Sequence, residues 1–276
     1  MGYAELLPST ASLAPLVACT WAISGPGPAH RVLPDGCIDV LVLDARAHHG
    51  GAEPARVVGT MRRAFVAPAQ TGAAFGIRFR PGEAARLLPE ASRELTDTDA
   101  PLAALWGDAG RALEAALVEL LERAVANAWS AETILVRAQP LVDAALRARL
   151  ASHGASVDLR MRTAAALLAS NEPIAVSDVA KRVNLSERQL MRRFTERVGV
   201  PPKLFARVMR LQRAAALLAR GVTPAEASSV AGYADQAHFT RDSTDLAAVT
   251  PGALAREMSD SSKTDEAIAS YNGRSR

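Results

Sequence analysis

The sequence predicts an α+β fold, in which a β-rich N-terminal domain and a helical segment precede an all-α C-terminal domain. Short runs of β-branched residues mark the first hundred positions, and apolar residues recur at helical spacing from Pro101 onward. The last hundred residues contain an internal repeat, which predicts two helix-turn-helix subdomains joined by a linker helix. The expected division is a β-rich sensing or dimerisation domain at 1–100, a helical segment and linker at 101–154, the helix-turn-helix domain at 155–258 and a disordered tail at 259–276.

Turn residues separate the strand signals of the N-terminal domain. The run Ile38–Leu43 (IDVLVL) follows Pro34-Asp35-Gly36, a typical turn sequence. We expect His30–Leu33 to pair with this run as a hairpin. The other expected elements are strands at Arg56–Val58 and Ala73–Phe79 and a short helix at Gly82–Leu88.

Two amphipathic helices are expected in the helical segment. Apolar residues at helical spacing predict the first from about Arg111 to Asn127, and the second runs from Ala131 to Leu150. Pro140 is expected to kink or split the second helix. Leucine-rich faces need a partner, so these helices either form a homodimer or pack on the β-rich domain.

The first copy of the repeat predicts a short helix, a turn and a capped second helix. Ser186 and Gln189 stand three residues apart in the form of a capping box, and Gly199 is a natural helix end. We expect the second helix to bury Leu190 and Phe194. The short helix is indicated by Ile174, Val179, Ala180 and Val183, and the turn by Asn184 and Leu185.

The second copy follows with an offset of 48 residues. Thr223-Pro224-Ala225-Glu226 combines an N-cap threonine, a proline at the first helical position and a glutamate at the third. A turn that is one residue longer brings the offset to 49, and Asp235 then caps a helix that carries Phe239. The matching helix and turn are indicated by Val222, Ala227, Ser228, Ala231, Gly232 and Tyr233.

A helical wheel shows which side chains of each second helix point away from the core. A single surface arginine is usually only solvated, but Arg192 and Arg241 fall at equivalent positions of the two copies. Arginine suits guanine edges and phosphates. The outward residues are Arg188, Arg192 and Thr195, flanked by Met191, in the first copy, and Ala237, Arg241 and Thr244, flanked by Thr240, in the second.

Pro201-Pro202 opens a helix between the two copies. From Leu204 to Ala219 this helix spans roughly 24 Å, enough to hold two DNA-reading units about one helical turn of DNA apart. Its outward Arg207, Arg210 and Arg213 are as compatible with phosphate contacts as with plain helix surface. Contacts to the DNA backbone, or helix caps, are expected at Ser186, Gln189, Arg193, Lys203, Arg210 and Gln236.

The C-terminal strings LSERQLMRRFTERVGVPPKLFARVMRLQRAAALL and AGYADQAHFTR, followed by TPGAL, resemble the DNA-binding domain of the AraC/XylS family of bacterial transcription regulators. The resemblance extends from near Ser156 to Met258. It implies a monomeric domain whose second helices enter successive major-groove segments of double-stranded DNA. The base-facing candidates that it implies are Arg188, Met191, Arg192, Ala237 and Arg241.

The second copy departs from the family pattern. Ala227 and Ser228 stand where a bulky aliphatic residue and an alanine are usual, and Ser243 replaces an expected aromatic residue. Asp242 and Asp245 stand where basic residues are common. Because a lost aromatic residue weakens packing, we expect the second unit to bind DNA less firmly than the first.

The strings RVLPDGCIDVLV and FGIRFRPGEAARLL resemble a β-rich domain that precedes this DNA-binding domain in some regulators. In the wider family such domains sense small molecules or dimerise, so the resemblance implies a possible effector or a homodimer. We expect no cofactor. No apolar run is long enough for a membrane span, and the first basic residue, Arg31, comes too late to flank a signal peptide. We therefore expect a cytoplasmic protein.

The charge distribution agrees with a nucleic-acid partner. Residues 156–258 hold 15 Lys and Arg against 10 Asp and Glu, a net of +5, whereas the whole chain has a net charge of +3. This excess is modest and is also compatible with a solvated surface.

Two alternative functions stay open. A DNA alkyl-transfer repair enzyme would need activated cysteines, but Cys19 and Cys37 have no zinc-ligand spacing. A metal site that combines them with His30, or with His48 and His49, is conceivable, although ordinary reduced cysteines are the simpler interpretation. The other alternative is a small-molecule binding or assembly protein with a decayed DNA-binding domain. Hence we expect no catalytic residues and no metal.

Overall fold

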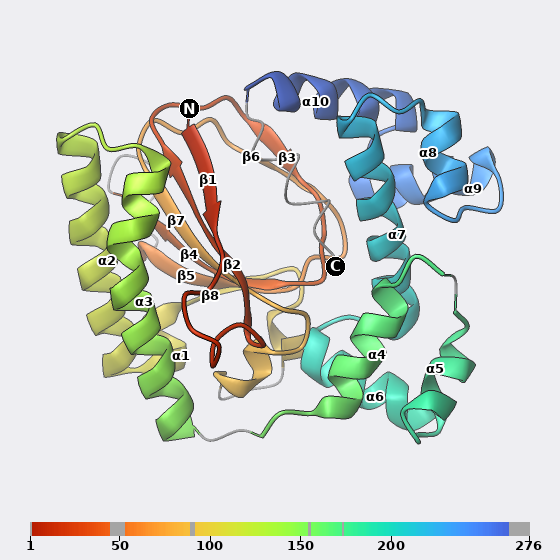
Figure 1. Ribbon diagram of the computed structural model, residues 1–276, viewed down its shortest axis with the longest axis horizontal. Coiled ribbons are helices and arrows are strands. Elements are labelled where there is room, and N and C mark those ends of the chain that lie inside the picture. The colour runs from red at the N-terminus through yellow and green to blue at the C-terminus, as the bar shows by residue number, and fades with distance from the viewer. Residues whose placement is uncertain (1, 45–52, 89–91, 154–155, 173, 265–276) are drawn as a thin grey trace.

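A computed structural model describes residues 2–44, 53–88, 92–153, 156–172 and 174–264, with side chains up to Ser259 (Figure 1). Three of the features expected from sequence lie outside the described residues. These features are the histidine pair His48 and His49, Gly154 of the expected linker and the tail residues 265–276.

The N-terminal domain is built on one antiparallel sheet of six strands in the order β1-β2-β7-β4-β5-β8. The predicted α+β fold, with strands first and helices last, is confirmed. The strands of this sheet are β1 (Gly2–Leu6), β2 (Val17–Ser24), β4 (Ile38–Leu43), β5 (Ala55–Val58), β7 (Ala74–Phe79) and β8 (Asp99–Pro101).

The sheet has one apolar face and one partly polar face because side chains alternate along each strand. In β4, Ile38, Val40 and Val42 are buried, whereas the intervening residues are partly exposed. The apolar face packs against α1 (Leu102–Trp106), α2 (Asp108–Ala126) and α3 (Ala131–His153) in one core. Figure 1 shows α2 and α3 on one side of the sheet and the C-terminal helices on the other.

The hairpin expected between His30–Leu33 and Ile38–Leu43 does not form. Instead, β3 (His30–Val32) pairs with β6 (Phe65–Ala67) in a separate two-stranded sheet. The reason is that β4 already has a neighbour on each edge, β5 on one and β7 on the other. A strand offers only two edges, so no edge of β4 is left for β3.

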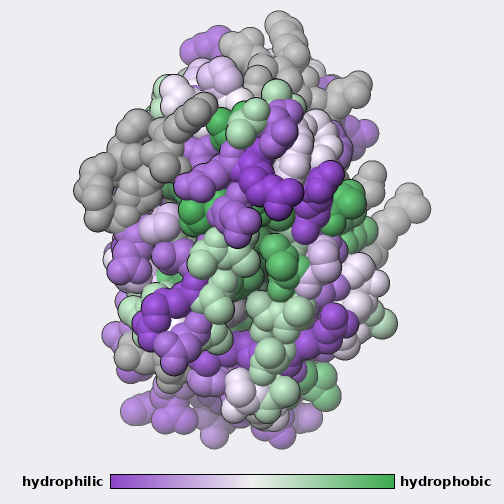
Figure 2. Space-filling view, turned by 90° about the vertical axis from the view of Figure 1, so that its left-hand side faces the viewer, coloured by the Kyte–Doolittle hydropathy of each residue, from purple (hydrophilic) through white to green (hydrophobic). Residues whose placement is uncertain are grey.

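Of the two outcomes expected at Pro140, a kink or a split, the split does not occur, because helix α3 continues through this residue. Pro140 is exposed, and water can reach the carbonyl group that loses its hydrogen-bond donor there. The apolar side of the helix, including Ile134 and Val142, stays buried on the sheet across the proline. Intramolecular burial also removes the reason for expecting a second chain at α2 and α3. On the outer surface of these helices, hydrophilic residues surround a central band of weakly apolar ones (Figure 2).

Two other expectations need adjustment. The helix expected at Gly82–Leu88 is only a 3₁₀ turn, Ala84–Arg86, and a second such turn follows at Ser92–Leu95. The tail was expected to begin at 259, but helix α10 (Pro251–Thr264) passes through that position. Within the described residues, no helix is both long and apolar enough to cross a membrane.

The C-terminal half consists of helices around two small cores that meet at helix α7 (Pro202–Ala219). Phe205 belongs to the first core, and Val208, Leu211 and Leu218 belong to the second. The linker helix expected from sequence is therefore present and contributes to both cores. The other elements are α4 (Leu159–Ala169), α5 (Val176–Arg182), α6 (Glu187–Val198), α8 (Pro224–Val230), α9 (Gln236–Asp242) and a π-helical turn, η3 (Ser243–Ala247).

Candidate nucleic-acid interface

The first helix-turn-helix unit is formed by α5, a tight turn and α6. Asn184 in the turn has a φ of 53°, a left-handed conformation that asparagine tolerates better than most residues. The predicted capping box is present. The Gln189 backbone N–H donates to the Ser186 hydroxyl at 3.2 Å, and the Ser186 backbone N–H donates to the Gln189 side chain at 2.9 Å. Ser186 and Gln189 thus fix the start of α6.

Helix α6 buries one side and exposes the other. Leu190 and Phe194 are fully buried, and the Phe194 ring meets the Phe205 ring of α7 edge-on at 5.3 Å. The base-facing candidates Arg188, Met191 and Arg192 are all exposed, and no ion pair of the described residues involves Arg188 or Arg192. Thr195, expected to face outward, is half-buried and donates its hydroxyl to the Met191 carbonyl at 2.8 Å.

The second unit repeats this arrangement with α8, a turn and α9. Its predicted capping box is also present, since the Thr223 hydroxyl accepts from the Glu226 backbone N–H at 3.3 Å and the Glu226 side chain accepts from the Thr223 N–H. Gly232 has a φ of 83° and takes the place of Asn184 in the turn. Asp235 caps α9 by accepting from the His238 N–H at 2.6 Å.

Helix α9 presents the second set of candidates. Phe239 is fully buried, and its ring centroid lies 4.9 Å from that of Tyr233. Ala237, Thr240 and Arg241 are exposed on the opposite side, as is Thr244 just beyond the helix. Gln236, the first residue of α9, is also exposed.

Buried polar contacts accommodate the unusual residues of the second unit. Ser243 is fully buried and donates to the Val249 carbonyl at 2.7 Å within the loop that follows the π-helical turn. Ser228, also buried, donates to the Asp235 carbonyl at 3.4 Å. At Ser228 and Ser243 the second unit therefore has hydrogen bonds in place of apolar packing.

The arginines of α7 all have contacts inside the domain. Arg207 pairs with the buried Asp242 at 2.8 Å and with Asp245 at 2.7 Å. Arg213 donates to the Ala169 carbonyl at 3.2 Å and, more weakly, to that of Ala231. These contacts were missed from the sequence, because no local signal shows which segment faces an arginine across the domain.

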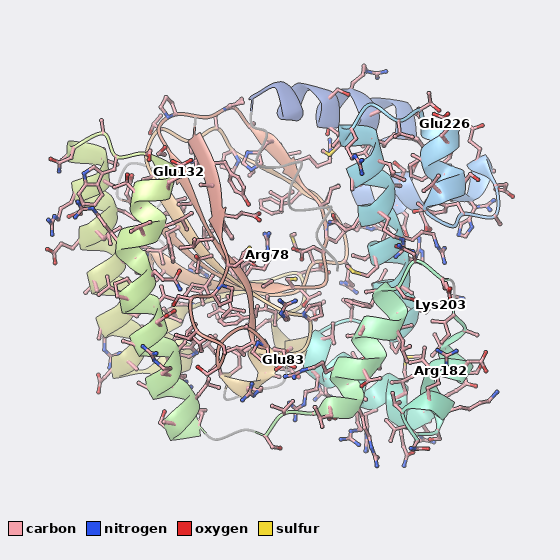
Figure 3. The ribbon with its side chains drawn as sticks, in the orientation of Figure 1. Arg78, Glu83, Glu132, Arg182, Lys203 and Glu226 are labelled. Carbon is pink, nitrogen blue, oxygen red and sulfur yellow. The ribbon has the colours of Figure 1, made fainter. Side chains whose placement is uncertain are left out.

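The expected backbone-contact residues divide into two groups. Arg193 and Arg210 have intramolecular partners, because Arg193 pairs with Asp158 at 2.8 Å and Arg210 lies over the Tyr233 ring at 5.3 Å. The other members are the two cap residues of α6, the exposed Gln236 and the exposed Lys203 at the start of α7, labelled in Figure 3.

A cluster of polar side chains, here called the polar cluster, lies on the face of the sheet that is not covered by α2 and α3. Arg78 is central and pairs with Asp39 at 3.0 Å and Asp35 at 3.3 Å. The Trp21 indole N–H donates to Asp39 at 3.2 Å, and the Trp21 ring stacks on Tyr3 at 6.5 Å. Figure 3 shows Arg78 on the side of the sheet that faces the C-terminal helices.

Burial perturbs the titration of this cluster. It raises the pKa of the Asp39 carboxyl, an effect that the nearby Arg78 opposes. Burial also raises the pKa of the Cys19 thiol to about 12 and that of the Cys37 thiol well above its usual value. Among the described residues, no group of three or more His, Cys, Asp and Glu side chains is placed to hold a metal ion.

Two family models match different parts of the chain. One, described as a helix-turn-helix domain, matches residues 179–257, and the other, described as a domain of unknown function (DUF6597), matches residues 4–101. An uncharacterized HTH-type transcriptional regulator, YbfI of Bacillus subtilis (strain 168), is 31% identical over 68 residues, which are 25% of each protein. The chain thus matches about a quarter of the length of this curated relative.

The chain is also similar to solved structures. An AraC-type regulator from Chromobacterium violaceum is 25% identical with a TM-score of 0.34, over 36% of this chain and 92% of its own. ToxT from Vibrio cholerae is 8% identical with a TM-score of 0.45, over 94% of this chain and 100% of its own. The family model over 179–257 and the two capped helix-turn-helix units coincide. The C-terminal part of this chain is therefore an AraC-type helix-turn-helix domain.

Proposed function

We propose that the whole protein is a sequence-specific, DNA-binding transcription regulator that acts in the cytoplasm and catalyses no reaction. One observation carries the proposal: Arg192 on α6 and Arg241 on α9 are both exposed at equivalent positions of two capped units. Helix α7 has 18 residues and spans about 27 Å between the units, near the pitch of DNA. Two units of one chain can thus reach successive major-groove segments, and the proposal requires no second copy.

Genome-wide mapping of bound DNA tests this proposal and supplies the operator. We expect discrete sites, whose affinity in a gel-shift assay falls steeply with salt as phosphate contacts release counterions. Arg188→Gln combined with Arg192→Gln should abolish enrichment at these sites. Arg111→Gln, on the exposed surface of α2, is the matched control and should leave it unchanged. Binding that ignores sequence would contradict the proposal and would favour a decayed DNA-binding domain in a small-molecule binding or assembly protein.

The same proposal includes a small-molecule effector bound at the polar cluster. The side chains of Arg78, Asp35 and Asp39 are 14–16% exposed, so solvent reaches them. An aromatic pair beside carboxylates suits a hydroxyl-rich or cationic small molecule, which can stack on the rings and donate hydrogen bonds. Gly76 makes the aromatic wall possible, because a Cβ at this position would lie 2.0 Å from the Trp21 ring.

One member of the cluster also connects it to the DNA-binding domain. Asp35 lies in the turn between β3 and β4, and the residues on either side of it, Pro34 and Gly36, lie against α7. The Gln212 side chain of α7 donates to the Pro34 carbonyl at 2.7 Å, and a Cβ on Gly36 would lie 2.4 Å from the Phe205 ring. A ligand that competes with Asp35 for Arg78 would therefore act on a turn in direct contact with the linker helix.

A thermal-shift screen of polyols, sugars and organic amines tests the effector site. At least one compound should raise the melting temperature of the wild-type protein, because a ligand that binds only the folded state stabilises it. Trp21→Leu should abolish that shift. Trp129→Leu, in the connection between α2 and α3, is the control and should retain it. A shift that survives Trp21→Leu would place the effector elsewhere.

A further inference from the structure

A groove beside α9 combines residues of both domains. Helices α6 and α9, the second helices of the two helix-turn-helix units, are called the first and second recognition helix below. The groove has a volume of about 540 Å³ and opens to solvent. Thr240 and Arg241 of α9 line it together with Arg63, which belongs to the N-terminal domain. The remaining lining residues are Thr244, Asp245 and Ala248, which follow α9 directly. Arg63 therefore lies beside the outward face of the second unit although it precedes Asp245 by 182 residues in the chain.

The position of Arg63 is fixed on both sides. Its guanidinium donates to Asp245 at 2.9 Å, and the backbone N–H of the next residue, Ala64, donates to the Leu246 carbonyl at 2.7 Å. On the other side, Arg62 is bonded through its backbone and its side chain to Asp97 of the N-terminal domain. The backbone hydrogen bond from Ala64 holds this loop against the C-terminal domain, so Arg63 is preorganised beside α9.

The charges around the groove leave a positive surplus. Asp245 accepts from both Arg207 and Arg63, and Arg207 also neutralises the buried Asp242. The hydrogen bond from Arg207 lowers the pKa of Asp245, so this carboxylate is ionised at neutral pH. Arg241 forms no ion pair among the described residues. Three arginines thus face two carboxylates, and the Arg63 side chain is still 73% exposed.

We propose that Arg63 contacts a DNA phosphate beside the second recognition helix, so that the N-terminal domain forms part of the DNA-binding surface. This inference rests on the proposed function. When Arg241 faces the major groove, the sugar–phosphate strand that borders the groove passes beside the helix. Arg63 lies beside the helix and is already half-neutralised by Asp245, which suits a backbone contact rather than base recognition. It supplies the positive charge that the second unit lacks at Asp242 and Asp245.

Salt-dependent binding of the full chain measures this contact directly. The probes are a fluorescein-labelled duplex from a mapped site and a mixed-sequence duplex of equal length. Arg63→Gln should weaken binding to both duplexes. The slope of log K against the logarithm of the salt concentration, here called the salt slope, should become shallower by about 0.9, the value of one phosphate contact on B-DNA. The affinity ratio of wild type to Arg63→Gln should accordingly fall about threefold between 50 and 200 mM salt. Arg63→Lys should preserve the slope because it keeps the charge.

Two further variants separate a DNA contact from a structural role. Arg62→Gln changes the neighbouring arginine, which does not line the groove, and should leave the slope unchanged. Asp245→Asn breaks the same interdomain pair from its other end. If Arg63 contacts phosphate, Asp245→Asn should retain or tighten DNA binding, because it removes a negative charge beside the DNA. If Arg63 only joins the domains, Asp245→Asn should weaken binding as Arg63→Gln does, and the proposal is wrong.

The remaining outcomes are equally decisive. An unchanged slope in Arg63→Gln, combined with lost binding in Arg192→Gln, would reject the phosphate contact and leave the proposed function intact. An unchanged slope with Arg63-dependent binding of inorganic phosphate would reassign the groove to a small anion. If the wild-type chain binds neither duplex, the proposed function itself fails.

Discussion

The Thr60 hydroxyl of the N-terminal domain donates a hydrogen bond of 2.6 Å to the carbonyl of Val198, the last residue of recognition helix α6. Thr60 is fully buried, and the Thr96 hydroxyl makes the adjoining bond to the Gly199 carbonyl at 2.7 Å. Two orphan carbonyl groups at the end of α6 are thus satisfied by the other domain rather than by water. The end of helix α6 is consequently held by hydrogen bonds from the N-terminal domain.

Thr60→Val should lower the free energy of unfolding by about 1–3 kcal/mol, the cost of a buried carbonyl group that loses its donor. Urea unfolding measures the loss, and hydrogen exchange should show faster opening at the end of α6. Thr244→Val makes the same exchange at an exposed position and should change stability by less than about 0.5 kcal/mol. Equal stability of the two variants would mean that the interdomain bond contributes nothing.

Arg207→Gln should destabilise the second helix-turn-helix unit. It leaves the Asp242 carboxylate, whose side chain is 4% exposed, without its cationic partner. Breaking a buried pair in this way costs about 3–5 kcal/mol. The unfolding free energy of Arg207→Gln should therefore fall by that order. The double variant Arg207→Gln with Asp242→Asn should recover most of the loss, and a failure to recover would show that the carboxylate is not the cause.

The two recognition helices should contribute unequally to operator affinity. Helix α6 has 12 residues and a buried aromatic contact to α7, whereas α9 has 7 residues and ends in a π-helical turn. Arg192→Ala should cost about 1–3 kcal/mol of binding free energy at a mapped site. Arg241→Ala should cost less, and equal losses in a fluorescence titration would refute the difference between the units.

The sequence predicted the C-terminal domain far better than the N-terminal one. Caps, turns and core residues there are local signals, and Ser186, Gly199 and Thr223 indeed mark helix ends. Strand pairing depends on residues far apart in the chain, so β3 was assigned to the wrong neighbour. The strands β1 and β2 were missed as well, since β1 contains no β-branched residue and small and aromatic residues separate the β-branched residues of β2.

The same contrast between local signals and contacts of distant residues applies to the candidate site. Exposure of Arg188, Arg192 and Arg241 follows from helical periodicity, and their role in DNA binding stays a prediction. The contacts of Arg207 and Arg63 depend on tertiary docking, which no local pattern encodes. For that reason the acidic residues of the second unit looked unfavourable in the sequence, whereas the structure pairs both with arginines.

Thiol reactivity separates a regulator from an alkyl-transfer enzyme, which needs an activated cysteine. Burial raises the pKa of Cys19 to about 12, so its thiolate is scarce at every physiological pH. At pH 8.5, Cys19 in the folded protein should react with a thiol reagent about a thousandfold more slowly than a free cysteine of pKa about 8.5. Because only the thiolate reacts, the rate should climb with pH for as long as the fold survives, without a plateau near 8.5.

Labelling in denaturant provides the control for this prediction. Both Cys19 and Cys37 are free, so the unfolded chain should show two rapidly reacting thiols. Burial also raises the pKa of Cys37, and this thiol should be protected in the folded state too. A folded protein that shows one fast thiol with a plateau below pH 8 would reveal an activated nucleophile. That result would revive the alkyl-transfer alternative, because protection by burial and activation for chemistry shift a thiol pKa in opposite directions.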